Sequence, residues 1–325
     1  MSKLAILGAG SWGTALAIVL APRFSRVALW GHDVERVRRM ADARENLDYL
    51  PGFRLAENVE PTGSLDDALE QAEILLGVMP SAHARATYRQ IRTQLPVVSA
   101  TKGLERGSLK RMSEVIAEST GTGRVAVLSG PTFAREIAAG QPAAVAISAQ
   151  DPLLAHHIQL AFRTPLFRPY TNTDPVGVEL AGALKNVIAI AAGVVHGLGL
   201  GSNARAALIT RGLAEISRVT QAAGGRAETL AGLAGLGDLV LTCTGALSRN
   251  RRVGIELAEG KNLAEILATM SMVAEGVETT SSALELARRC GVEMPIATQV
   301  HRILRGERSP KEAIRDLMER SLKGE

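Results

Sequence analysis

The most informative segment of the sequence is Gly8-Ala9-Gly10-Ser11-Trp12-Gly13. It follows directly on the apolar run Lys3–Leu7, which is predicted as a strand, and it opens the segment Thr14–Leu20, which is predicted as a helix. A G-x-G-x-x-G motif is weak evidence alone, but between a strand and a helix it is typical of a dinucleotide-binding turn. The sequence therefore predicts a βαβ unit that binds a dinucleotide.

Each glycine of the motif has a separate task in such a turn. Gly8 permits the tight turn, Gly10 lets the backbone approach the pyrophosphate, and Gly13 lets the helix pack closely on the strand. The phosphates would then lie at the helix N-terminus, where unpaired N–H groups and the helix dipole favour negative charge. A glycine-rich turn without a ligand is the alternative interpretation.

The first half of the chain alternates short apolar runs with amphipathic segments. The further predicted strands are Val27–Trp30, Ile74–Val78, Val97–Ala100, Val125–Leu128, Ala143–Ile147 and Leu166–Pro169. The helices predicted between the earlier strands are Val34–Arg44, Ser64–Gln71, Ala82–Arg92 and Leu109–Ser119. This alternation indicates a parallel, doubly wound sheet. The predicted fold class is therefore α/β, of the Rossmann type.

The pattern changes at Asp174-Pro175. Asp as an N-cap with Pro at the first helical position predicts a helix start, and the periodicity is helical from there onward. We therefore expect a dinucleotide-binding Rossmann domain over residues 1–173 and an all-α substrate-binding domain over residues 174–325. A chain of 325 residues is long enough for two cores.

Composition argues against several functional classes. The formal net charge is only +4 and aromatic residues are 3% of the chain, without the basic stripe that nucleic-acid binding needs. The uncharged stretch 186–204 is about long enough to span a bilayer, but its Ala and Gly content favours a buried core helix, so we expect no membrane span. Two distant cysteines, Cys243 and Cys290, indicate a reducing compartment, and we expect a cytoplasmic protein. No His, Asp or Glu cluster has the spacing of metal ligands, so no metal site is predicted.

The end of the second strand indicates which dinucleotide binds. NAD enzymes usually place Asp or Glu there to accept hydrogen bonds from the ribose, whereas Trp30 and Gly31 occupy that position here. His32 and Arg36 could contact a 2′-phosphate, and Asp33 could either serve the ribose or cap the next helix. We therefore predict NADP in preference to NAD.

Polar residues also follow two later strands. Thr101-Lys102-Gly103 comes directly after one strand, and Ser129-Gly130-Pro131-Thr132 comes after the next. Ligands of open α/β sheets bind beyond the carboxyl ends of the strands. Lys102 is therefore either a functional residue or an ordinary solvated loop lysine.

Lys185 is the sharpest signal in the second half. Its helical neighbours three and four positions away are Ala181, Gly182, Ile188 and Ala189, so no carboxylate on that face can pair with it. Such a lysine must extend to solvent, find a distant partner, or give up its proton near neutral pH. The last property suits a general acid/base for a carbonyl–alcohol interconversion.

Two further positions complete the candidate site. Asp238, the one charged residue from 230 to 247, could either orient Lys185 or cap a helix. Ser248-Arg249-Asn250 opens a helix with basic residues where the dipole favours acids. That arrangement makes sense if an anion binds there, with Arg249 offering a fork to phosphate; a solvated basic turn is the alternative.

Taken in order, these segments resemble the bacterial NAD(P)-dependent glycerol-3-phosphate dehydrogenase family. The matching stretches are GAGSWGTALA (8–17), LWGHD (29–33), ATKGLE (100–105), SGPTFAREIAAG (129–140), ELAGALKNVIAIAAG (179–193), AGLGDLVLTCTG (234–245), SRNRRVG (248–254) and VAEGVETT (273–280). Gly245-Ala246 departs from the polar or acidic residues of many members.

The resemblance implies reduction of dihydroxyacetone phosphate to sn-glycerol 3-phosphate, a precursor of phospholipids, by a homodimer. It implies cofactor contacts by Ser11, Trp12, His32, Lys102, Ala134, Arg249, Val273 and Glu275. It implies substrate contacts by Lys102, Gly130, Thr132, Lys185, Asp238, Ser248, Arg249 and Asn250.

The mechanism that we expect is direct hydride transfer to the C2 carbonyl. Lys185 would supply the proton, Lys102 would help to polarise the oxygen, and Arg249 with Asn250 would hold the phosphate. One alternative is a related β-hydroxyacid or ketopantoate-type reductase, in which the Ser248–Asn250 turn would bind a carboxylate. Another is an NADP-sensing regulator without turnover, for which a buried Lys185 would have no use.

Overall fold

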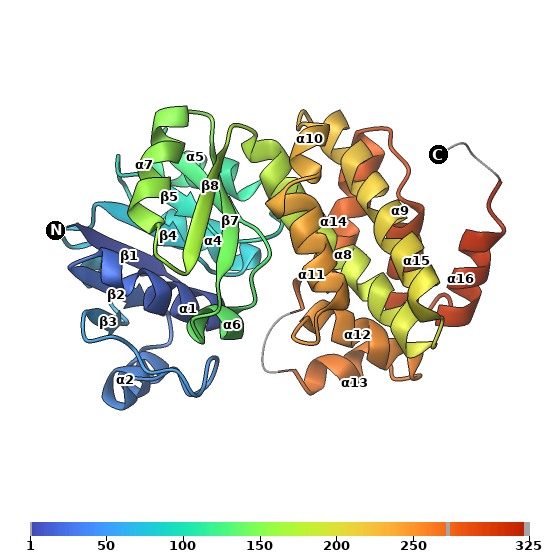
Figure 1. Cartoon of the computed structure of the whole chain (residues 1–325), viewed down its shortest axis with the longest axis horizontal. Coiled ribbons are helices and arrows are strands. Elements are labelled where there is room, and N and C mark those ends of the chain that lie inside the picture. The colour runs from blue at the N-terminus through green and yellow to red at the C-terminus, as the bar shows by residue number, and fades with distance from the viewer. Residues whose placement is uncertain (1, 271–273, 322–325) are drawn as a thin grey trace. The chain divides into compact units, whose positions relative to one another are not determined.

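The computed structural model describes residues 2–270 and 274–321, and it divides into two compact units, Met1–Glu179 and Leu180–Glu325 (Figure 1). The division falls inside helix α8 (Pro175–Gly197). This helix begins as predicted, because the Asp174 carboxylate accepts a hydrogen bond from the Gly177 N–H at 2.9 Å. The domain boundary predicted between residues 173 and 174 stays a prediction.

The N-terminal unit is built on one sheet of eight strands in the order β3-β2-β1-β4-β5-β6-β7-β8. The bounds are β1 Lys3–Leu7, β2 Arg26–Trp30, β3 Val59–Thr62, β4 Ile74–Gly77, β5 Val97–Ser99, β6 Val125–Ser129, β7 Ala143–Ala149 and β8 Phe167–Asn172. Strands β1 to β6 run parallel to one another, in the α/β arrangement that the sequence predicts.

Two details of the predicted sheet differ from the structure. Strand β7 runs antiparallel to β6 and parallel to β8, so the sheet is mixed rather than wholly parallel. The segment between β6 and β7 contains only the five-residue helix α6 (Ala134–Ala138), and a pattern of apolar runs carries no information on strand direction. The missed strand β3 is short and contains Pro61, which a sheet tolerates at its edge.

The helices of this unit cover both faces of the sheet. They are α1 Ser11–Leu20, η1 Ala21–Arg23, α2 Val34–Ala43, α3 Leu65–Leu69, α4 Ser81–Tyr88, α5 Met112–Thr120, α6 and the unpredicted α7 Pro152–Phe162. Alternate residues of β1 point to opposite faces. Leu4 and Ile6 pack in the core with residues of α1 and α7, whereas Ala5 and Leu7 pack in the core with α4 and α5. This two-sided burial is the doubly wound layering predicted from the sequence.

The described part of the C-terminal unit is helical, as predicted (Figure 1). After α8 come α9 Gly201–Ala222, α10 Ala227–Leu230, the π-helical turn η2 Leu233–Gly237, α11 Asp238–Thr244, α12 Arg249–Ala258, α13 Leu263–Ala268, α14 Glu275–Arg289, α15 Pro295–Leu304 and α16 Pro310–Met318. Glycines bring three of these helices onto α8. A Cβ at Gly193 of α8 would lie 2.0 Å from the Arg251 carbonyl of α12. A Cβ at Gly212 of α9 would lie 2.5 Å from the side chain of Ile188 on α8, and a Cβ at Gly276 of α14 would lie 2.6 Å from the Asn186 carbonyl on α8.

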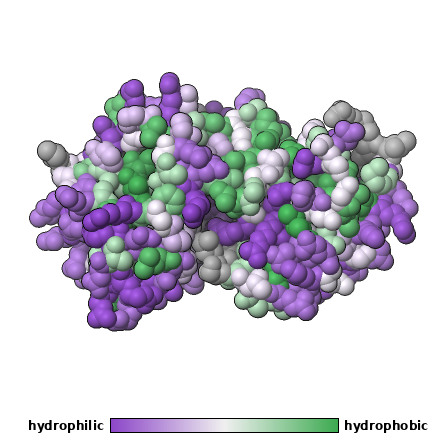
Figure 2. Space-filling view, turned by 60° about the horizontal axis from the view of Figure 1, so that its bottom comes forward, coloured by the Kyte–Doolittle hydropathy of each residue, from purple (hydrophilic) through white to green (hydrophobic). Residues whose placement is uncertain are grey.

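Helix α8 is the core helix that the sequence indicates. Among single helices of the described residues, α8 alone is long and apolar enough to cross a membrane, and its most apolar stretch is completely buried inside the protein. The bent pair Ala227–Thr244 and Arg249–Ala258 is also long and apolar enough if the two segments are taken as one span. Figure 2 shows hydrophilic and apolar residues interspersed over the face in view. Burial of this kind is ordinary for the central helix of a globular unit.

Candidate active site

The turn between β1 and α1 has the backbone geometry that the predicted tasks of its glycines require. Gly8 has a φ of +127°, and a Cβ there would lie 2.9 Å from the Val78 carbonyl carbon. A Cβ on Gly13 would lie 1.9 Å from the Gly8 carbonyl oxygen. At Gly10, in contrast, a Cβ would meet no other part of the protein within 4 Å. The space that a pyrophosphate would need beside this backbone is therefore open.

The N-terminus of α1 is suited to an anion. Its N-cap is Gly10, no side chain caps it, and its first turn contains no acidic residue. The Trp12 indole Nε1 is buried and has no hydrogen-bond partner in the described chain. These features fit a dinucleotide whose pyrophosphate lies at this helix end, with Ser11 at the first helical position.

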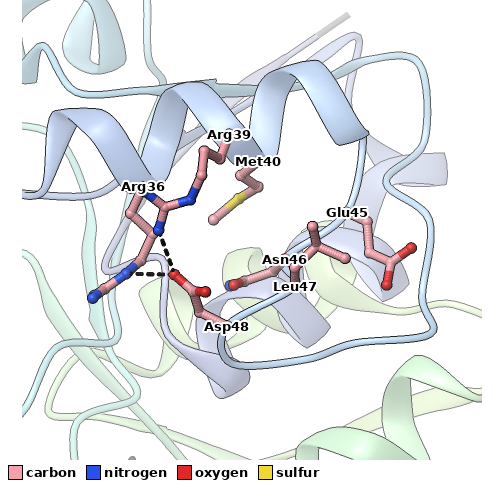
Figure 3. Close-up of a pocket in the computed structure, with 7 residues that line it drawn as sticks. All are labelled: Arg36, Arg39, Met40, Glu45, Asn46, Leu47 and Asp48. Atoms are coloured by element: carbon pink, nitrogen blue, oxygen red, sulfur yellow. Dashed lines mark hydrogen bonds and ion pairs between the residues drawn. The ribbon is translucent and has the colours of Figure 1, made fainter.

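The residues after β2 are already engaged with one another. Asp33 caps α2 by accepting a hydrogen bond from the Arg36 N–H at 3.0 Å, and this bond lowers the pKa of Asp33. The Arg36 guanidinium donates from Nε to Asp48 at 2.8 Å and from Nη1 to the Tyr49 hydroxyl at 2.5 Å. Figure 3 shows Arg36 and Arg39 both directed at the Asp48 carboxylate beside a small pocket. The Arg36 guanidinium could therefore contact a 2′-phosphate only while it is also paired with Asp48, which partly neutralises its charge. His32, the other predicted contact, is exposed.

Lys102, Gly130 and Thr132 lie together beyond the ends of β5 and β6. The Lys102 Nζ donates to the Gly130 carbonyl at 3.4 Å, and the Thr132 hydroxyl donates to the same oxygen at 3.2 Å. Gly130 has a φ of +151°, and a Cβ there would lie 3.0 Å from Val145 on β7. Ala134 begins α6 just after this turn. Parallel strands thus gather these residues at the carboxyl edge of the sheet, as the sequence predicts.

In the C-terminal unit Lys185 finds its partner on a different helix. Its Nζ lies 2.9 Å from the Asp238 Oδ1, and the two side chains are only 6% and 1% exposed. Asp238 is the first residue of α11 and pairs with Lys185 through its side chain, while Gly237 takes the N-cap position. The Asp238 carboxylate is therefore paired with the lysine, and it is not the N-cap of α11.

Thr242 completes this pair, and the sequence analysis missed it. The Lys185 Nζ donates to the Thr242 hydroxyl at 2.6 Å, and that hydroxyl donates to the Asp238 backbone carbonyl at 2.6 Å. Its spacing of four residues from Asp238 places both on one face of α11, and that spacing was the available signal. The ammonium is thereby fixed by two acceptors of one helix. Burial raises the pKa of the neighbouring Cys243 thiol to about 12, so this cysteine is not a nucleophile near neutral pH.

The turn Ser248–Asn250, which the sequence predicts to open a helix, does so at the start of α12. Ser248 caps the helix by accepting from the Arg251 N–H at 3.2 Å, and the first turn contains no acidic residue. Arg249 makes no ion pair within the described residues. The Asn250 Oδ1 accepts from the Gly276 N–H at 2.9 Å, which fixes the Asn250 amide so that its NH₂ group is the end left to donate.

Glu275 lies in the first turn of α14, next to the same cluster. The Asn186 Nδ2 donates to its carboxylate at 3.3 Å, so the residue that follows Lys185 is linked to Glu275. Sequence reasoning gave Asn186 no role, because nothing in the sequence shows which helix packs beside α8. Val273, which the resemblance implies as a cofactor contact, lies outside the described residues.

Comparison with known proteins agrees with these features in both units. A family model described as the N-terminus of NAD-dependent glycerol-3-phosphate dehydrogenase matches residues 3–155, and one described as the C-terminus of the same enzyme matches residues 174–315. A relative from Koribacter versatilis named glycerol-3-phosphate dehydrogenase [NAD(P)+] is 54% identical, over 98% of both chains. The chain belongs to the NAD(P)+-dependent glycerol-3-phosphate dehydrogenase family.

A solved glycerol-3-phosphate dehydrogenase, that of Coxiella burnetii, supports the assignment. It is 42% identical, with a TM-score of 0.94 over 98% of this chain and 99% of its own. A ketopantoate reductase from Ralstonia eutropha has a TM-score of 0.59 at 15% identity over 96% of this chain and 99% of its own, which shows a shared fold alone. The chain therefore has glycerol-3-phosphate dehydrogenase activity, the interconversion of dihydroxyacetone phosphate and glycerol 3-phosphate with NAD(P) as coenzyme, in phospholipid-precursor metabolism.

The Lys185 geometry gives the first prediction. Lys185→Ala should lower kcat by about two to four decades, the usual size of a general acid/base contribution, with the coenzyme KM nearly unchanged. Lys185→Arg should recover little of the rate, because a guanidinium keeps its proton at neutral pH. Steady-state kinetics at a temperature well below each variant's Tm would measure both.

Lys261→Arg is the matched control, since Lys261 also pairs with a carboxylate, that of Glu256, but is half-exposed. If Lys185→Arg keeps kcat while its Tm falls, Lys185 is a structural residue and has no catalytic role.

Proposed function

We propose that Lys185 is the general acid that protonates the C2 oxygen of dihydroxyacetone phosphate, and the base of the reverse reaction. The observation that carries this proposal is the buried contact of Lys185 with Asp238 and Thr242. The carboxylate keeps the ammonium charged and pointed in one direction, while the apolar surroundings exclude water from it. A donor fixed before substrate arrives loses no freedom in the transition state.

The remaining roles rest on the family resemblance and, for the glycine turn and Lys102, also on the surroundings of the residues. The bound nicotinamide supplies the hydride in the reduction direction. Gly8, Gly10, Ser11, Trp12 and Gly13 form the turn proposed to hold the pyrophosphate, and Ala134 with Glu275 is proposed to complete the coenzyme contacts. Lys102, with Gly130 and Thr132 beside it, is proposed to polarise the carbonyl oxygen.

The N-terminus of α12 is the proposed site of the substrate phosphate. Arg249 and the Asn250 amide offer donors there, and Ser248 holds the turn in place. Binding energy from this remote phosphate would position the carbonyl for attack. The family resemblance also leads us to propose a cytoplasmic homodimer.

The coenzyme prediction is that NADPH is preferred over NADH. No acidic residue occupies the strand end at Trp30-Gly31, and the Asp33 carboxylate is occupied as a helix cap. Arg36→Ala should lower kcat/KM about tenfold with NADPH, the size of one charged hydrogen bond, and much less with NADH. Arg39→Ala is the matched control, because it also pairs with Asp48 but is more exposed. A clear preference of the wild type for NADH would contradict this prediction and make Asp33 a ribose ligand.

The phosphate prediction concerns Arg249. Arg249→Ala should raise KM for dihydroxyacetone phosphate by about one to two decades, the loss expected for a hydrogen bond to a charged group, with an unchanged Tm. Unphosphorylated dihydroxyacetone should be a very poor substrate for both proteins. A wild type that turned over dihydroxyacetone nearly as well would show that the phosphate site is wrong.

A further inference from the structure

The first turn of α12 contains three arginines that differ in their surroundings. Arg252 is 55% exposed and pairs with Glu256 one turn along the same helix, Nε to Oε1 at 2.6 Å. Arg249 and Arg251 form no ion pair within the described residues. The positive charge of Arg252 is therefore balanced inside the protein, whereas the charges of the other two arginines are not.

Arg251 is the more constrained of these two. Its backbone N–H donates to the Ser248 hydroxyl at 3.2 Å, and its carbonyl oxygen packs directly on Gly193 of α8, where a Cβ would lie only 2.0 Å away. Its side-chain Nε is buried and has no hydrogen-bond partner among the described residues. A buried guanidinium N–H without a hydrogen-bond acceptor lowers the stability of the protein. In a binding site, such an N–H is explained when a bound ligand supplies the acceptor.

The charge of Arg251 acts on the same buried part of α11 as the catalytic pair. The Cys243 thiol, one residue after Thr242, experiences the charges of Lys185, Asp238 and Arg251 together. Lys185 and Asp238 pair with each other at 2.9 Å, and Arg251 adds a positive charge that acts on the same thiol. A positive charge at this position suits an anionic substrate.

We propose that Arg251 is a second cationic contact for the substrate phosphate, in addition to Arg249. This inference rests on the proposed placement of the phosphate at the N-terminus of α12. Residues two apart lie on opposite sides of a helix, but an anion at the helix end lies near the axis, where side chains from both sides can reach it. A phosphate monoester carries about −1.5 to −2 charges at pH 7, so two guanidinium groups match its charge better than one does.

The test measures KM for dihydroxyacetone phosphate and the inhibition constant of inorganic phosphate, at saturating NADPH. Arg251→Gln should raise both by about tenfold or more, the loss expected for a charged hydrogen bond, while kcat changes less than about threefold. Arg252→Gln is the matched control and should change neither constant by more than about twofold, because exposed ion pairs contribute little. Arg251→Lys keeps the charge, so both constants should lie between those of the wild type and those of Arg251→Gln. This variant replaces Arg251→Gln in the test if the Gln variant does not fold.

Two results would overturn the proposal. One is that Arg251→Gln and Arg251→Lys leave KM and phosphate inhibition like those of Arg252→Gln. The other is an unchanged KM with a shifted pH profile of kcat, which would mean that Arg251 acts on Lys185 and not on phosphate. If Arg249→Ala raises KM but the Arg251 variants do not, only this inference fails; if none of them raises KM, the placement of phosphate at α12 fails as well.

Discussion

The buried ion pair between Lys185 and Asp238 is the interaction on which the C-terminal unit depends. Moving two charges out of water costs several kcal/mol for each ion, and the attraction between them offsets this cost only when the geometry is good and other donors and acceptors are satisfied. Thr242 supplies that satisfaction by accepting from the lysine and donating to the Asp238 carbonyl. If α11 moved away from α8, Lys185 and Asp238 would each be left as an unpaired buried charge. The ion pair therefore holds α11 against α8.

Glycines make this arrangement possible because they let helices approach α8 at backbone distance. Gly193, Gly254 and Gly276 each have backbone atoms of another helix where a Cβ would be. The start of α12, where we place the phosphate, is therefore fixed relative to the helix that carries Lys185. In the N-terminal unit the contact of Gly13 with the Gly8 carbonyl has the same function for the coenzyme turn. Binding elements in both units are positioned by backbone contacts that no larger residue permits.

Sequence reasoning succeeded where the physical signal is local. Spacing and periodicity predicted the glycine turn, the Asp174 cap, seven of the strands and the helical second half. The isolation of Lys185 left a distant partner as one of three alternatives, with Asp238 as the candidate. Sequence reasoning failed where the decisive contact is remote in sequence. The direction of β7, the pairing of Arg36 with Asp48 and the link from Asn186 to Glu275 depend on packing. Glu215 is a similar case, because it is a buried carboxylate whose backbone partner Ile296 is 81 residues away.

If Lys185 donates the proton while Asp238 keeps it charged, the pH dependence of kcat for dihydroxyacetone phosphate reduction must change when the Asp238 carboxylate is removed. The profile should be measured at saturating substrate and NADPH for the wild type and for Asp238→Asn. In the wild type, kcat should fall at high pH as Lys185 loses its proton. In Asp238→Asn this fall should move to lower pH by about one unit or more, because an opposite charge that favoured the ammonium is gone. Superimposable profiles of the two proteins would show that Asp238 does not hold the proton on Lys185.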